Sequence, residues 1–260
     1  MPNLIKEVTR TQLEGASLPN HGSSYTVVPH GDVISTVKSA LKDNNFRIVQ
    51  EHYRSTTKAN VAQGVYYLYS NDDPDMGLMF AWSNSYDKSR RFKCALGTHV
   101  FVCGNGMLTG NMNNYSRKHT GTADQEMVSA VNNQLINAAL HFKSLVRDKN
   151  LMKTIILDDK KQSEIVGRLF LKENLLSPSQ TSVVKKEMEE PSHFYNADPN
   201  SLWSLYNNVT IALKQSHPRY WIEDHQKFHD FIMAEYASML GQKFVDSVDQ
   251  LELFAPVDEL

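Results

Sequence analysis

At 260 residues the chain is long enough to bury a sizeable core, as one large domain or two small ones. It is 41% hydrophobic and 22% charged, an ordinary globular composition, and no apolar run approaches the roughly 20 residues of a membrane-spanning helix. The N-terminus lacks a signal-peptide pattern and only two cysteines occur, so we expect a protein of a reducing cytosol.

The net charge of −2 combines two halves of opposite sign. Residues 1–150 carry 16 Lys and Arg against 12 Asp and Glu, which gives +4; residues 151–260 carry 11 against 17, which gives −6. The first half is therefore the one suited to a polyanion such as nucleic acid. A difference of this size does not by itself indicate a nucleic-acid-binding protein.

The first part of the chain predicts a sheet domain. Residues 1–30, rich in Gly, Ser and Asn, are expected to form an irregular leader, and Asp32 is a predicted N-cap of a helix that continues past Leu41. Apolar side chains then alternate in four predicted strands, at 46–56, 61–70, 77–85 and 91–103. A helix followed by an antiparallel meander predicts an α+β domain over residues 31–150.

The rest of the chain predicts helices. N-cap and capping-box residues place helix starts at Thr122, Ser177 and Asp198, and a last helix is expected from about Pro218 to Leu240. We therefore expect a helical region over residues 151–242. Residues 243–260 are expected to be a flexible acidic tail.

Two clusters of basic residues flank the last predicted strand. The first consists of Lys88, Arg90, Arg91 and Lys93, and the second of Tyr115, Arg117, Lys118 and His119. Cations contact phosphates while aromatic faces stack on bases, at about 1–3 kcal/mol per base. The pattern predicts a groove for single-stranded nucleic acid. The alternative is a solvated hairpin beside an ordinary charged loop.

Two other segments invite a phosphate or a metal interpretation. Residues 103–107, CGNGM, lack the Lys and the Ser or Thr of a phosphate-binding loop, so we expect a tight turn in which Gly104 and Gly106 adopt positive φ. His225 and His229 lie four apart on one helix face and can share a zinc ion. Gln226 stands where the metalloprotease motif has Glu, so surface or core histidines are favoured.

No catalytic set is evident in the sequence. There is no GxSxG motif, and Asp72, Asp73 and Asp75 crowd one turn, where repulsion and solvation are favoured over metal binding. We therefore predict no catalytic residue, no metal and no cofactor.

Residues 84–107 and 117–121 resemble the signature of a phage/plasmid-like protein family of unknown function. The matching positions are Asn84, Ser85, Asp87, Phe92, Val102, Cys103, Asn105, Gly106, Lys118, His119 and Thr120. Lys118 replaces an Arg of that pattern, with Arg117 one place earlier. The resemblance covers about residues 30–235 and implies a bacterial cytosol and a role in phage or plasmid DNA metabolism. It implies no particular activity.

The predicted order of elements is also similar to the core of the single-strand annealing proteins, which bind single-stranded DNA as rings. One helix, a meander and a long helix are common to both. That similarity implies a homo-oligomeric ring, and at the level of fold it does not transfer function.

The C-terminal sequence QLELF resembles the peptide by which bacterial DNA-processing proteins dock on the replicative sliding clamp. Gln250, Leu251, Leu253 and Phe254 match its positions. Such a segment orders on binding and inserts Leu and Phe anchors into an apolar pocket. The alternative is that these side chains fold onto the helical half of the protein.

We therefore expect a non-enzymatic DNA-metabolism protein of a phage or mobile element. It would bind single-stranded DNA during replication or recombination and be recruited to the sliding clamp. One alternative is an inhibitor of a host replication or defence protein. Another is a metal-dependent enzyme that uses His119 or the pair His225 and His229.

Overall fold

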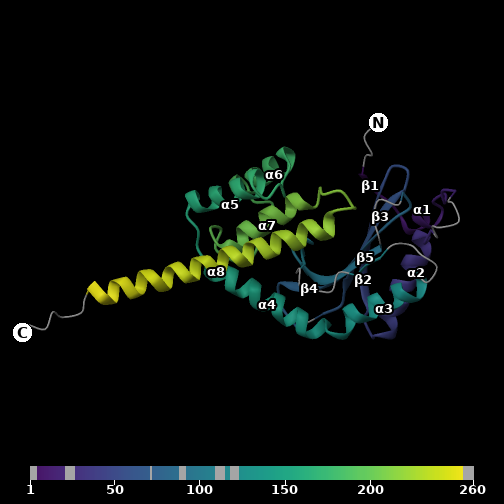
Figure 1. The fold of residues 1–260 in the computed structure, drawn as a ribbon, viewed down its shortest axis with the longest axis horizontal. Helices are drawn as coiled ribbons and strands as arrows, with labels where there is room; N and C mark the ends of the chain where they lie inside the picture. The colour runs from purple at the N-terminus through teal and green to yellow at the C-terminus, as the bar shows by residue number, and fades with distance from the viewer. Residues whose placement is uncertain are drawn as a thin grey trace, which may run out of the picture.

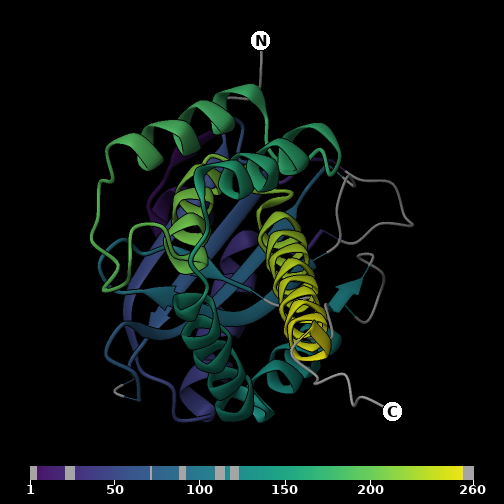
Figure 2. The same ribbon diagram turned by 90° about the vertical axis from the view of Figure 1, so that its left-hand side faces the viewer.

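The structure is a computed structural model of the chain (Figures 1 and 2). It describes residues 5–20, 27–70, 72–87, 92–108, 115–117 and 123–253, with the backbone alone described for 115–117, 123–126 and 240–253. None of the helices in these ranges combines the length and the apolar character that spanning a bilayer requires.

A curled antiparallel sheet forms the first half of the chain. Neighbouring strands in the sheet follow the order β1-β2-β3-β4-β5-β6. β7 lies outside this order and pairs with β5, as β6 does. The strands are β1 (Ile5–Glu7), β2 (Ile48–Thr56), β3 (Val61–Leu68), β4 (Met76–Ser85), β5 (Phe92–Val100), β6 (Gly106–Met107) and β7 (Tyr115–Arg117). The four predicted strands are thus confirmed as β2 to β5, joined as a meander.

Two helices accompany the N-terminal part of the sheet and six follow it within the described ranges. They are α1 (Arg10–Glu14), α2 (His30–Asp43), α3 (Ala123–Ile136), α4 (Ala138–Thr154), α5 (Asp159–Leu171), α6 (Pro178–Glu189), α7 (Leu202–Leu213) and α8 (Trp221–Leu253). The predicted α+β class is confirmed: a helix and an antiparallel meander precede a part that is all helical.

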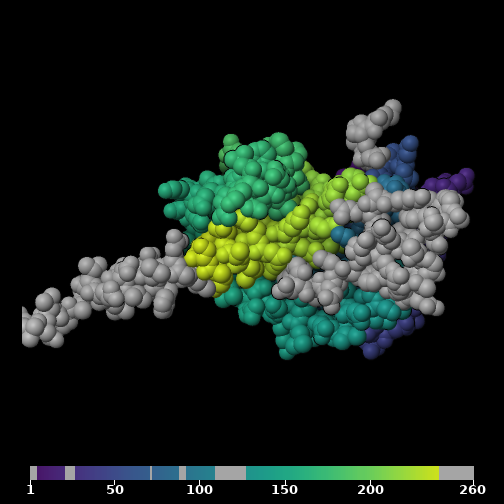
Figure 3. Space-filling model, in the orientation of Figure 1, coloured from purple at the N-terminus to yellow at the C-terminus, as the bar shows by residue number. Residues whose placement is uncertain are grey.

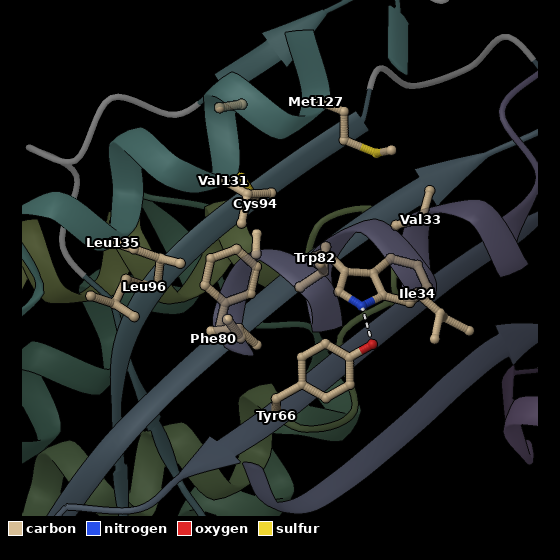
Figure 4. Close-up of a cluster of buried hydrophobic side chains, with 14 of the residues drawn as sticks. Val33, Ile34, Tyr66, Phe80, Trp82, Cys94, Leu96, Met127, Val131 and Leu135 are labelled. Atoms are coloured by element: carbon tan, nitrogen blue, oxygen red, sulfur yellow. Dashed lines mark hydrogen bonds between the residues drawn. The ribbon is translucent and has the colours of Figure 1, made fainter. Parts of the chain in front are cut away.

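The first core lies between the sheet and the helices α2 and α3 (Figure 4). Phe80 and Trp82 of β4 point into it, because alternate residues of a strand share a face. Trp82 Nε1 donates a hydrogen bond to Tyr66 Oη at 3.2 Å. Gly64 lies opposite Trp82, and a Cβ at Gly64 would come within 2.3 Å of the indole. The glycine therefore makes room for the indole.

The opposite face of the sheet is covered as well. Met79 and Ala81 of β4 pack there against Trp221 and Ile222 at the start of α8. All ten residues of β4 are buried as a result. The sheet therefore lies between two helical layers, and β4 is its central, fully enclosed strand.

A second core joins the helical half to the end of the sheet. Trp203 and Tyr206 of α7 stack with ring centroids 5.7 Å apart, and Phe228 of α8 packs on Tyr206. Val146 of α4 contacts both this core and the first one. In the space-filling view α8 lies between α5 and α6 on one side and α4 on the other (Figure 3). The expected boundary at residue 150 falls inside α4.

Two of the three aspartates of the β3–β4 turn, Asp73 and Asp75, are paired with lysines, which corrects the expectation of solvated, mutually repelling carboxylates for these two, whereas Asp72 is exposed. Lys149 Nζ of α4 lies 2.7 Å from both carboxylate oxygens of Asp73 and 3.0 Å from Asp75, and Lys153 lies 2.7 Å from Asp75. Burial raises the pKa of the Asp75 carboxyl, but hydrogen bonds from Lys153 and Lys149 outweigh it and lower the pKa. The turn is thereby fixed to α4.

Three boundaries differ from those expected. Residues 5–14 of the expected leader form two elements. β1 pairs with β2, and α1 begins with a capping box at Thr9. The long helix expected after Thr122 is divided at Asn137 into α3 and α4. The last helix continues to Leu253 and projects beyond the other helices (Figure 1), so residues 243–253 are helical where a flexible tail was expected.

Candidate nucleic-acid interface

Four aromatic rings from three parts of the sheet lie together on the face toward α7 and α8. The Tyr67 and His99 rings are stacked, with centroids 3.9 Å apart and planes 6° apart. His52 lies 5.1 Å from Tyr67, and Phe101 meets His99 edge to face at 5.3 Å. β2, β3 and the end of β5 supply these rings, so only the folded sheet brings them together.

Two glycines leave room for this stack. A Cβ at Gly77 would lie 2.8 Å from both the His99 and the Phe101 ring. A Cβ at Gly104 would lie 2.6 Å from Tyr67 Oη, and Gly104 has φ +62°. Tyr67 Oη also donates to the carbonyl oxygen of Gly104 at 3.2 Å. The rings are therefore held in place by the backbone around them.

The edge of the stack is open to solvent. Phe101 is 47% exposed, and Tyr69, two residues after Tyr67, is 49% exposed. The guanidinium of Arg47 lies over the Tyr69 ring, 4.1 Å from its centroid, as in a cation–π contact. Exposed aromatic faces beside a cation offer a surface on which other flat rings can stack.

The rings border two adjoining cavities of about 450 and 540 Å³, which share His52, Tyr67, Cys103 and Gly104. We call these two cavities together the sheet groove. Such volumes fall within the roughly 300–1,000 Å³ typical of ligand sites. The groove is lined by aromatic side chains at one end and by charged side chains at the other.

Two cations line the charged end. Arg54 donates to the carbonyl oxygens of Lys214 and Ser216 after α7, and Lys214 donates to the carbonyl oxygen of Cys103. Within the described part of the chain neither forms an ion pair with a carboxylate, although Glu7 and Glu51 line the same cavity. Burial lowers the pKa of both Arg54 and Lys214. Glu7 and Glu187 offset part of this lowering for Arg54 and Lys214 respectively, without a direct ion pair. An anion in the groove could make that direct contact.

The imidazole in the stack is neutral at physiological pH. Burial, followed by the nearby His52, lowers the pKa of His99 to about 4. Burial also raises the pKa of the Tyr67 phenol to about 12. The stacked pair of Tyr67 and His99 is therefore uncharged across the neutral pH range. Arg54 and Lys214 supply positive charge at the other end of the groove.

The first predicted basic cluster is described only at its end. Lys88, Arg90 and Arg91 lie outside the described residues. Lys93 lies on β5 and forms an ion pair with Glu223 of α8, with 15% of its side chain exposed. Lys93 therefore joins β5 to α8 in this structure.

The second cluster is described only through its backbone. Tyr115 and Arg117 belong to β7, where Tyr115 pairs with Cys94 and Arg117 with Phe92 of β5. Lys118 and His119 lie outside the described residues. β7 thus places Tyr115 and Arg117 beside the start of β5, at the end of that strand away from His99.

The histidines of α8 do not share a metal site. His225 Nδ1 donates to the carbonyl oxygen of Gly106 at 3.0 Å, whereas His229 lies 3.5 Å from Asp148 and 3.3 Å from Tyr206 Oη. No cluster of three metal-binding side chains occurs among the described residues. Both are buried, so of the surface and core positions expected for them the structure shows core positions.

The CGNGM segment is a turn that docks on α7. Gly104 has the expected positive φ, whereas Gly106 begins β6 with an ordinary one. The Asn105 side chain donates to the backbone and side-chain oxygens of Asn207, both at 3.1 Å. The predicted structural role of the CGNGM segment is confirmed. Docking on α7 also places Cys103 and Gly104 in the wall of the sheet groove.

The sheet groove was not predicted from the sequence. Alternation in the sequence places Tyr67 and Tyr69 on one strand face. His52, however, lies on the preceding strand and His99 lies two strands later, so no local pattern joins them. At the other end of the chain, Gln250, Leu251 and Leu253 belong to α8, and Phe254 lies outside the described residues.

Comparison with known proteins identifies a family and no function. A family model described as "Domain of unknown function (DUF932)" matches residues 18–229, so the chain belongs to this family. No curated protein and no solved structure is similar enough to the chain to count as a match.

Proposed function

We propose that this member of the DUF932 family is a non-enzymatic protein that binds single-stranded nucleic acid, with single-stranded DNA as its ligand. The observation that carries the proposal is the sheet groove, in which an aromatic stack adjoins two cations without carboxylate partners among the described residues. Stacking platforms beside positive charge are the usual means of binding single strands without reading their sequence.

The arrangement favours single strands over duplexes for a physical reason. Bases can stack on Tyr69 and Phe101 only when they are not already stacked within a duplex. Arg54 and Lys214 lie at the other end of the groove, where a phosphate can approach them. The predicted basic residues Lys88, Arg90, Arg91, Arg117 and Lys118 belong to the proposal as further phosphate contacts of a longer strand.

A binding assay with two groove variants tests the proposal. We expect oligo-dT to bind more tightly than a duplex of equal length, with an affinity that falls as salt rises. Phe101→Ala and Tyr69→Ala should each lower the affinity by about 5- to 150-fold, the equivalent of roughly 1–3 kcal/mol per stacked base. Leu140→Ala, at a side chain 71% exposed on α4, is the matched control and should have no effect. Equal binding by all three variants would overturn the proposal.

The cellular setting is a further part of the proposal. The resemblance to phage- and plasmid-like proteins supports a role in replication or recombination of a mobile element, in the bacterial cytosol. The QLELF segment supports recruitment to the sliding clamp, with Leu251, Leu253 and Phe254 as anchors. By analogy with single-strand annealing proteins, the protein would assemble as a homo-oligomeric ring on its strand.

A further inference from the structure

Among the described residues that line the sheet groove, Lys214 is the only lysine. It follows α7 directly and lines the larger of the two cavities, of about 540 Å³. Its Nζ donates to the carbonyl oxygen of Cys103 and forms no ion pair with a carboxylate of the described ranges. A lysine in such a place can act as a point charge, and once it has lost its proton it is also a nucleophile.

The surroundings of Lys214 favour the neutral amine more than water does. Burial lowers the pKa of Lys214, and the charges of Cys103 and Glu187 oppose this effect in part. Desolvation of this kind is one of the ways in which a lysine becomes a nucleophile near neutral pH. Arg54, whose guanidinium keeps its charge, lines the same cavity and remains available to a phosphate when Lys214 is neutral.

A phenol hydroxyl is held by the same turn as the amine. Lys214 Nζ donates to the carbonyl oxygen of Cys103, and Tyr67 Oη donates to the next carbonyl oxygen, that of Gly104, at 3.2 Å. Both side chains line the larger cavity. Burial raises the pKa of Tyr67 to about 12, so the hydroxyl keeps its proton at neutral pH and can give it to a leaving oxygen. An amine and a proton donor are the two groups that imine formation with an aldehyde requires.

We infer that Lys214 captures an aldehyde carried by a single strand, at a nucleotide that has lost its base. The deoxyribose of such a nucleotide presents C1′ as an aldehyde when its ring opens. The amine adds to C1′ and forms a carbinolamine. The carbinolamine hydroxyl then leaves as water with a proton from Tyr67, and the protonated imine returns a proton to the phenolate. Addition of water reverses the capture.

This inference rests on the proposed binding of single strands in the sheet groove. The bases that flank the damaged nucleotide would stack at the aromatic end, and Arg54 would hold a phosphate. The sugar without a base would then lie at the charged end, within reach of Lys214. A free sugar phosphate has the same aldehyde, so the experiment compares the two sources.

Reductive trapping of the full chain on a single-stranded oligonucleotide with one abasic site tests the inference. Cyanoborohydride reduces an imine to a stable amine, so we expect a covalent adduct that peptide mass mapping of the wild type places on Lys214. Lys214→Arg keeps the positive charge but removes the nucleophile, and it should lower the adduct yield about tenfold or more. Lys185→Arg, at a side chain 75% exposed on α6, is the matched control and should be trapped like the wild type. Thermal melting verifies that both variants are folded.

A second arm uses 2-deoxyribose 5-phosphate, which presents the aldehyde without a strand. Its adduct on Lys214 should require a concentration at least about fivefold higher, because no flanking base stacks in the groove. Equal trapping of the two sources would overturn the inference, as would an adduct on other lysines or undiminished trapping by Lys214→Arg. It also fails if the wild type binds the abasic oligonucleotide without forming an adduct, a result that leaves single-strand binding intact. Failure to bind either this oligonucleotide or oligo-dT would remove the proposed function together with the inference.

Discussion

His99 is the residue whose protonation most directly affects the candidate interface. Its pKa is about 4 in the folded chain because it is buried, against about 6.5 in the unfolded chain. Above pH 6.5 both states are neutral and stability does not depend on this group. Between about pH 6.5 and 4 only the unfolded chain takes up the proton, so stability falls by up to about 1.4 kcal/mol per pH unit.

Replacing His99 with Phe tests this dependence, because an aromatic ring that does not titrate can keep the stack with Tyr67. We expect the free energy of unfolding of the wild type to fall by about 2 kcal/mol more than that of His99→Phe between about pH 7 and 5. Urea unfolding at the two pH values measures the difference. Parallel pH profiles would show that His99 is not held neutral in the fold.

Gly64 and Gly167 give opposite predictions for the same substitution. Gly64→Ala places a Cβ within 2.3 Å of the Trp82 indole, and crowding in a packed core costs about 1–3 kcal/mol. Gly167 lies in α5, and a Cβ there would have no neighbouring atom within 4 Å, so Gly167→Ala should stabilise the helix by about 0.5–1 kcal/mol. Thermal melting of the two variants should shift in opposite directions.

Among the elements, α4 and the β3–β4 turn depend on one buried charge cluster. Lys149 is 2% exposed and is bonded to Asp73 and Asp75. Lys149→Ala would leave Asp73 buried without a cation, and breaking a buried pair in this way costs about 3–5 kcal/mol. Lys185→Ala is the control, since its pair with Glu189 on α6 has side chains 75% and 64% exposed and should contribute at most about 0.5 kcal/mol.

Chemical denaturation of the two lysine variants measures how much this cluster contributes to the free energy of unfolding. A loss of less than about 1 kcal/mol in Lys149→Ala would contradict the expected cost of an unpaired buried carboxylate.

The elements that the sequence predicts well are those with a long periodic pattern. Alternation identified β2 to β5, and the capping box at Ser177 identified α6, because these signals are local. β1, β6 and β7 have three residues or fewer and exist through pairing with β2 and β5, which no local pattern encodes. The sheet groove escaped prediction for the same reason, since it joins β2, β3 and the loop after α7.

Charge was the weaker guide to the candidate site. The basic residues at 88–93 predicted a nucleic-acid-binding cluster. Lys93, however, is paired with Glu223 of α8, which lies 130 positions later in the chain. Conversely, Arg54 and Lys214 form no cluster in the sequence, and they line one cavity because Arg54 of β2 bonds to the segment that follows α7. Whether a cation is available to a ligand depends on its partners in the fold.

At the scale of the whole molecule, the candidate strand-binding surface and the clamp-like peptide are separated by α8. The helix starts against the sheet at Trp221 and ends at Leu253, where it projects beyond the other helices (Figure 1). A projecting end leaves the body of the protein free to hold a strand while the C-terminus contacts a second protein. Docking in an extended form would require the last turns of α8 to unwind, which limits the affinity.

This separation predicts that the two activities can be removed independently. Leu253→Ala together with Phe254→Ala should weaken binding to a purified bacterial sliding clamp by at least about 2 kcal/mol, because buried Leu and aromatic anchors dominate such contacts. Glu252→Ala, at the variable position of the motif, is the control. Affinity for oligo-dT should stay within about twofold and the melting temperature should not change, since the substitutions leave the sheet groove untouched. If the double variant instead lost stability, its side chains would be packed against the protein itself, and the C-terminus would be a structural element with no role in recruitment.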